Sequence, residues 1–130
     1  MKEVLVPLSP GELLDKITIL RIKVARIQEA AKLANVKLEL SLLQQTWKDS
    51  GAAAHDVALD KRALENVNER LWDIEDRIRD KEARQTFDRE FIELARAVYI
   101  CNDERAAIKK RINVQLGSRI VEEKSYKQYR

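Results

Sequence analysis

The stretch from Phe91 to Ile112 constrains the fold more than any other part of the sequence. Residues at alternating spacings of three and four within it form one stripe along an α-helix: Phe91, Leu94, Val98, Cys101, Arg105, Ile108 and Ile112. All of them except Arg105 are apolar or nearly so. A helix with one apolar side must bury that side against other elements, so this stretch predicts a long amphipathic helix packed in a core.

Arg105 is the exception in this stripe. A buried guanidinium without a partner is too costly to keep, so Arg105 needs a carboxylate, a bound anion or water. Glu75 borders the apolar stripe of the preceding predicted helix, and we expect it to be the partner. The pair would set the register of the helices, or Arg105 would instead hold an anionic ligand through two parallel hydrogen bonds. The candidate ligand-binding residues are therefore Arg105, Asn102, Tyr99, Glu75 and Lys16.

Three more amphipathic helices precede this one. Ser9-Pro10-Gly11-Glu12 predicts a helix start, with Ser9 as the cap, Pro10 in the first turn and Glu12 completing a capping box. This helix runs to about Ile27. We expect the second helix over residues 31–48, the third from the cap Asp56 to about Arg84, and the fourth from Thr86 or Asp88 to a left-handed cap at Gly117.

The predicted fold class is all-α, as a four-helix antiparallel bundle or as paired helical hairpins, in one domain over residues 1–130. Nothing between Ile27 and Leu33 breaks a helix, so the first two helices could be continuous. Residues 1–8 form a short extended segment. Residues 118–130 form a C-terminal arm that is frayed, folds back on the bundle, or pairs with the segment at Val4–Val6.

Composition excludes several classes of protein. Charged residues make up 36% and the net charge is +3, but residues 1–65 hold 10 basic and 9 acidic groups, so no basic arm for nucleic acid is present. No apolar run is long enough to cross a membrane. The single Cys101 forms no internal disulfide and no cysteine metal site, and a reducing cytoplasm is the expected location.

Catalytic and metal-binding patterns are also lacking, and we expect no metal and no cofactor. The single histidine, His55, lies in a loop of small residues without a nucleophile pattern around it. Four acidic residues do recur on one face of the third helix, namely Glu69, Asp73, Asp76 and Asp80. This face lies opposite the apolar stripe, so we expect these carboxylates to contact water and the arginines between them and not a metal ion.

The fourth predicted helix has a second stripe beside the first, formed by Ile92, Ala95, Tyr99, Asn102 and Ala106. Two adjacent stripes indicate that this helix packs against two neighbours. Trp72 likewise lies off the seam of its own helix. Such extra apolar positions are typical of a symmetric dimer, and the candidate interface residues are Ile92, Ala95, Tyr99, Ala106, Trp72 and Tyr126. We therefore expect a homodimeric protein-interaction or assembly module. The alternative is a small anionic-ligand-binding protein or enzyme with its site around Arg105.

Four motifs carry a resemblance to a known family: PGELLDKITILRIK (10–23), LWDIEDRIR (71–79), FIELARAVYICNDERAAIKKRIN (91–113) and GSRIVEEKSYKQY (117–129). They cover most of the chain, and it resembles a family of small bacterial proteins classed as a domain of unknown function. The resemblance implies a helical bacterial protein without an assigned activity. It also implies a link to glycan or nucleotide-sugar metabolism as the context of the alternative function.

Overall fold

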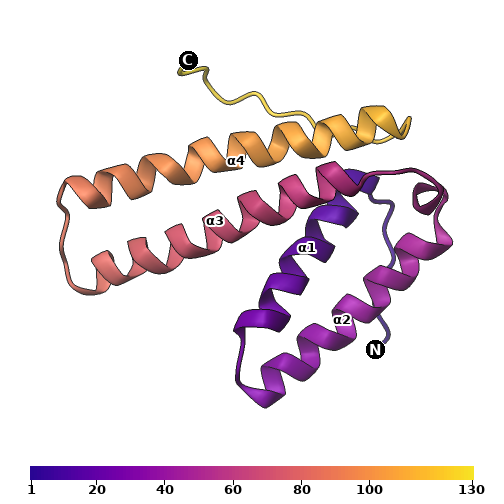
Figure 1. Ribbon diagram of the computed structural model, residues 1–130, viewed down its shortest axis with the longest axis horizontal. Helices are drawn as coiled ribbons and strands as arrows, with labels where there is room; N and C mark the ends of the chain where they lie inside the picture. The colour runs from indigo at the N-terminus through magenta and orange to yellow at the C-terminus, as the bar shows by residue number, and fades with distance from the viewer.

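The computed structural model describes residues 1–130 as two helical hairpins, without any strand. The elements are α1 (Pro10–Arg26), α2 (Ala30–Asp49), the 3₁₀ turn η1 (Gly51–Ala54), α3 (Ala58–Ala83) and α4 (Arg89–Gln115). The all-α prediction is confirmed, and of the two predicted arrangements the paired hairpins describe the molecule better. α3 and α4 lie side by side, while the α1–α2 hairpin projects from one end of that pair at a steep angle (Figure 1).

α1 is the central element of the fold. It packs against α2, α3 and α4, whereas α2 packs almost only against α1 and η1. The apolar residues spaced three and four apart along α2 are accordingly only half-buried, and α2 contributes no buried residue: Leu33, Val36, Leu40, Leu43 and Trp47. Two hairpins that meet mainly through α1, with Trp47 of α2 also at the edge of the core, leave much of both without a covering layer.

Three of the helix ends follow the capping chemistry expected from the sequence. The prediction of Asp56 as the cap of α3 is wrong by one position, because Val57 precedes the helix without a side-chain cap and Asp56 Oδ1 accepts the N–H of Ala58 at 3.1 Å. Ser9 Oγ accepts the N–H of Glu12 at 3.2 Å, although the Glu12 carboxylate turns to lysines and does not complete the capping box. Asp88 caps α4 by accepting the N–H of Phe91 at 3.0 Å. Gly117 has a φ of 65°, which is the left-handed cap predicted there. Residues 27–29 separate α1 from α2, so the two helices are not continuous.

One apolar cluster joins the three helices that meet. Its buried members come from α1, from the residue before α3, from α3 itself and from the predicted stripe of α4: Leu14, Val57, Leu64, Val67, Leu71, Cys101, Ile108 and Ile112. Cys101 is a buried free thiol, as predicted. Only 20 of the 130 residues are buried in total, so the core is small for a chain of this length.

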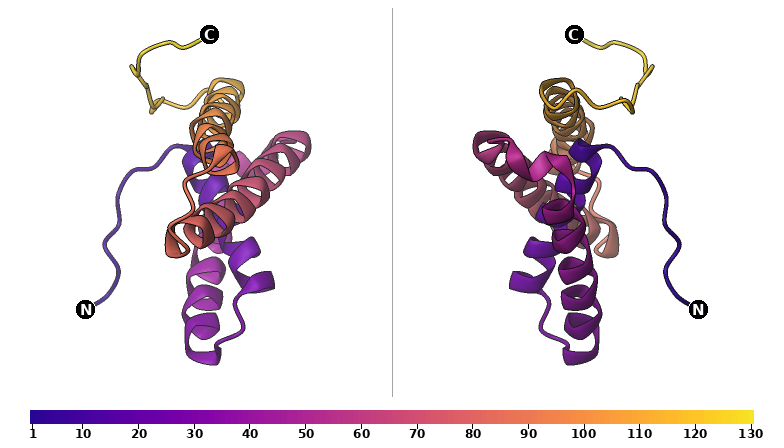
Figure 2. Two further views of the ribbon diagram at one scale, coloured as in Figure 1. Left: turned by 90° about the vertical axis from the view of Figure 1, so that its left-hand side faces the viewer. Right: turned by 90° about the vertical axis from the view of Figure 1, so that its right-hand side faces the viewer.

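The two ends of the chain behave differently. Residues 1–8 are extended and leave the body of helices (Figure 2). The C-terminal arm returns along α4, where Tyr129 Oη donates to Asp103 Oδ2 at 2.5 Å and the Tyr129 ring meets the edge of Tyr99. The arm therefore folds back on the helices and does not pair with the N-terminal segment. None of the helices is both long and apolar enough to cross a lipid bilayer.

Candidate functional site

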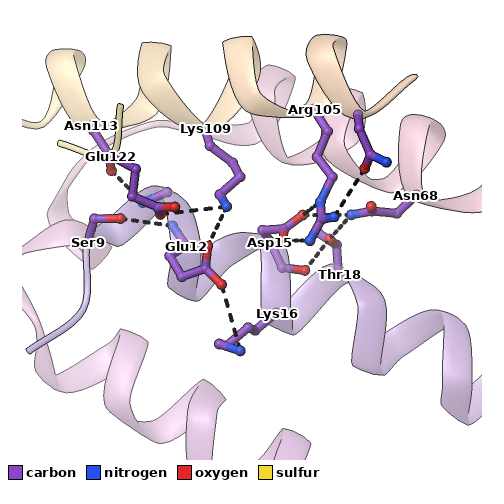
Figure 3. A network of polar contacts seen from close by, with 12 residues as sticks. Ser9, Glu12, Asp15, Lys16, Thr18, Asn68, Arg105, Lys109, Asn113 and Glu122 are labelled. Atoms are coloured by element: carbon purple, nitrogen blue, oxygen red, sulfur yellow. Dashed lines mark hydrogen bonds and ion pairs between the residues drawn. The ribbon is translucent and has the colours of Figure 1, made fainter. Parts of the chain in front are cut away.

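Arg105 is bound by Asp15 of α1. Its Nε donates to Asp15 Oδ1 at 2.9 Å and its Nη2 donates to Asp15 Oδ2 at 2.5 Å (Figure 3). The prediction of Glu75 as the partner is wrong. α1 lies against this part of the α4 stripe, and the Asp15 carboxylate of α1 reaches Arg105 from there. Glu75 instead accepts a hydrogen bond from Arg79 on the surface of α3, at 3.1 Å.

A polar network completes the surroundings of Asp15, whose exposed fraction is 0%. Asn68 Nδ2 of α3 donates to Asp15 Oδ1 at 2.9 Å and lies 3.1 Å from Thr18 Oγ1. Thr18 Oγ1 donates in turn to the backbone oxygen of Asp15 at 2.8 Å. The fully buried carboxylate thus accepts hydrogen bonds from both α3 and α4, and this cluster fixes how the three helices meet.

Asp15 engages two of the five N–H donors of the guanidinium, one on Nε and one on Nη2. Its hydrogen bonds raise the pKa of Arg105 above the ordinary value, and they outweigh the opposing effect of burial. Arg105 Nη1 has only Asn102 Oδ1 as a neighbour, at 3.5 Å, and the Arg105 side chain is 28% exposed. The part of the guanidinium that remains for a ligand is the side that Asp15 does not engage.

A second polar cluster joins the first turn of α1 to the end of α4. Lys109 binds Glu12 and also lies 3.6 Å from Glu122 of the C-terminal arm. Asn113, which is buried, accepts the backbone N–H of Gly11 through Oδ1 at 2.7 Å. A Cβ atom at Gly11 would lie 2.5 Å from the Lys109 backbone oxygen, so only glycine permits this approach of the two helices.

The structure brings together only some of the predicted ligand-binding residues. Glu75, Asn102 and Arg105 line one shallow notch that also includes Trp72 and Asp76. Tyr99 and Lys16 lie elsewhere, Tyr99 beneath the C-terminal arm and Lys16 at a groove near the N-terminus. Asp15 already neutralises Arg105, and Glu75 and Asp76 add negative charge to the notch, so a bound anion is electrostatically disfavoured.

The predicted interface residues are also divided. Tyr99, Ala106 and Tyr126 line a pocket between α4 and the chain's own C-terminal arm. Ile92 is exposed near the α3–α4 turn, and Ala95 is half-buried. Trp72 is half-buried and lies beneath the guanidinium of Arg26, at 5.9 Å from the ring centroid. The arm thus covers the middle of the second stripe within a single chain.

A large hollow lies at a place that sequence analysis missed. An open apolar groove of about 640 Å³ separates the N-terminal segment from α2. Its walls include Val4, Val6 and Leu13 on one side and Leu43 and Trp47 on the other. The groove forms because α2 packs on α1 alone and the N-terminal segment stands away from both.

Asp15 and Asn68 are the central polar residues that sequence analysis also missed. Like Arg105, each is a polar residue on the apolar face of its helix. Asp15 directly follows Leu13 and Leu14, and Asn68 is adjacent to Val67 in the α3 stripe. A search for complementary polar residues inside all apolar stripes, and not only next to Arg105, would have found them.

A family model covers residues 4–129 of this chain. The chain belongs to DUF6165, a family of unknown function. No curated protein and no solved structure matches it. In this DUF6165 chain, no group of three or more His, Cys, Asp or Glu side chains is arranged to hold a metal ion.

Proposed function

We propose that this DUF6165 chain is a homodimeric assembly module. The observation that supports it is the size of its surface. The single chain exposes 9,381 Å², whereas a compact monomer of 15.1 kDa exposes about 7,100 Å². The excess of about 2,300 Å² is more than twice the roughly 800 Å² that each partner buries in a standard interface.

Seven of the 15 exposed large apolar side chains lie on α2 or on the N-terminal segment, residues 1–8. Leu38 and Leu42 of α2 are exposed, and so are Val4, Leu5 and Val6. Exposed apolar side chains that gather on one helix or one segment are typical of a protein–protein contact. A second copy that covers α2 and the groove beside it would supply the layer that α2 lacks in the single chain.

The alternative, an anionic-ligand site at Arg105, has less support. Asp15 takes two hydrogen bonds from the guanidinium, and the notch around it carries more carboxylates than cations. Such a buried pair suits a role in setting helix register. The buried thiol of Cys101 is compatible with a reducing cytoplasm, where we place the dimer.

Size-exclusion chromatography with light scattering tests the proposal. We expect a mass near twice 15.1 kDa, and Leu42→Glu should shift the dilution profile toward the monomer. Ile92→Glu is the matched control, because Ile92 is also exposed, at 56% against 45% for Leu42, but lies on the second stripe of α4. A monomeric wild type would refute the proposal. A dimer that is weakened by Ile92→Glu and not by Leu42→Glu would move the interface to α4.

A further inference from the structure

The N-terminal segment has the properties of an unpaired β-strand. Val4, Leu5 and Val6 are 79%, 87% and 66% exposed, although they carry the most apolar run near this end of the chain. No backbone hydrogen bond involves residues 1–8. An extended segment with free N–H and C=O groups and apolar side chains readily pairs with a second strand.

The segment is also held in a defined position. Ser9, from which it departs, is buried and caps α1, so the segment leaves the helices in a fixed direction (Figure 2). The groove between this segment and α2 has an apolar wall at Leu43 and Trp47. This groove is open, and nothing in the single chain covers its apolar wall.

We infer that the N-terminal segments of two copies pair as antiparallel strands, so that each lies in the groove between its partner's segment and its partner's α2. The inference rests on the proposed homodimer and specifies its contact. Antiparallel pairing of two identical segments is self-complementary, and it closes at two chains. Each segment thereby forms hydrogen bonds with the backbone N–H and C=O groups of the other segment. The valines of each segment cover the apolar wall at Leu43 and Trp47 of the other copy.

The charges at the edge of the groove agree with a two-fold contact. Lys16 of α1 and Glu39 of α2 both line the groove and carry opposite charges. In a two-fold arrangement each of these residues can face the oppositely charged residue of the second copy. Lys16 Nζ lies 3.7 Å from Glu12 of its own chain and its side chain is 47% exposed, so it can also meet Glu39 of a second copy. A rim that carries both signs can pair with an identical rim, whereas a rim of one sign would repel it.

Cysteine cross-linking tests the pairing directly. Antiparallel pairing centred on Leu5 places the two Leu5 residues opposite each other and Val4 opposite Val6. Leu5→Cys and an equimolar mixture of Val4→Cys with Val6→Cys are therefore oxidised by copper phenanthroline, and disulfide-linked dimers are measured on non-reducing gels. Because a disulfide requires Cα atoms within about 7 Å, paired strands should cross-link at least about tenfold faster than chains that collide at random. Leu59→Cys is the control for random collision, since Leu59 is 83% exposed and lies outside the segment. Wild type controls for the buried Cys101.

A second pair of variants tests the backbone hydrogen bonds. Leu5→Pro removes an N–H, whereas Leu5→Ala keeps it and removes most of the side chain. Leu5→Pro should raise the dimer dissociation constant about tenfold above that of Leu5→Ala, since both symmetric strands lose a donor. Residues 1–8 make no hydrogen bond in the single chain, so neither variant should impair its folding.

The outcomes separate this inference from the proposed function. Fast cross-linking together with the proline effect supports paired segments. Cross-linking no faster than that of Leu59→Cys, in a chain that light scattering shows to be dimeric, overturns the inference and leaves the homodimer. A monomeric wild type overturns both.

Discussion

Replacing Arg105 by methionine should destabilise the protein strongly, because it leaves a buried charge behind. Asp15 is fully buried and would keep only Asn68 as a side-chain donor. Breaking a buried ion pair from one side costs about 3–5 kcal/mol, and the 28% exposure of the Arg105 side chain places this one near the lower end. A loss of about 3 kcal/mol lowers the melting temperature by roughly 10 °C in a domain of this size.

The double-mutant cycle with Asp15→Asn gives the sharper result. Asp15→Asn alone should destabilise the protein, because Arg105 loses its partner. In the Arg105→Met background the same substitution should stabilise it, because asparagine is neutral and still accepts the hydrogen bond from Asn68. Urea unfolding followed by circular dichroism at one protein concentration measures all four chains. Free energies that add within about 0.5 kcal/mol would refute a coupled buried pair.

Three further predictions follow from other contacts. Gly11→Ala should destabilise the protein by about 1–3 kcal/mol, because the added Cβ would lie 2.5 Å from a backbone oxygen. Gly51→Ala is the control, because a Cβ at Gly51 meets open space. Equal melting temperatures for the two variants would contradict the close approach at Gly11. Hydrogen bonding to Lys81 lowers the pKa of Asp88 and raises that of Lys81, so this pair stabilises the fold above the ordinary pKa of aspartate, near 4, and loses that contribution as the pH falls further. Asp88→Asn keeps the helix cap, so the difference in melting temperature between wild type and this variant should stay constant from neutral pH to about pH 5 and shrink in more acidic buffer; a constant difference in acid would argue against the pair. Tyr129→Phe should speed proteolysis within the C-terminal arm while the melting temperature stays within about 1 °C, and an unchanged cleavage rate would show that the hydroxyl does not hold the arm.

Local physics was enough to predict the helices from the sequence. The spacing of apolar residues in α4, the cap at Ser9 and the left-handed position of Gly117 each depend on residues within one or two turns. Such signals are present in the chain before it folds. The burial of Cys101 followed from the same periodicity.

Only the tertiary structure decided which elements meet. Arg105 stands out in the sequence, but its partner is 90 positions away in Asp15, and Glu75 is as good a choice on chemistry alone. The choice depends on how α1 lies against α3 and α4, and the close contact at Gly11 sets that approach. The groove beside Trp47 likewise exists because α2 packs on α1 alone. The spacing of apolar residues predicts which face of a helix is buried. Which other helix covers that face depends on packing across the whole chain.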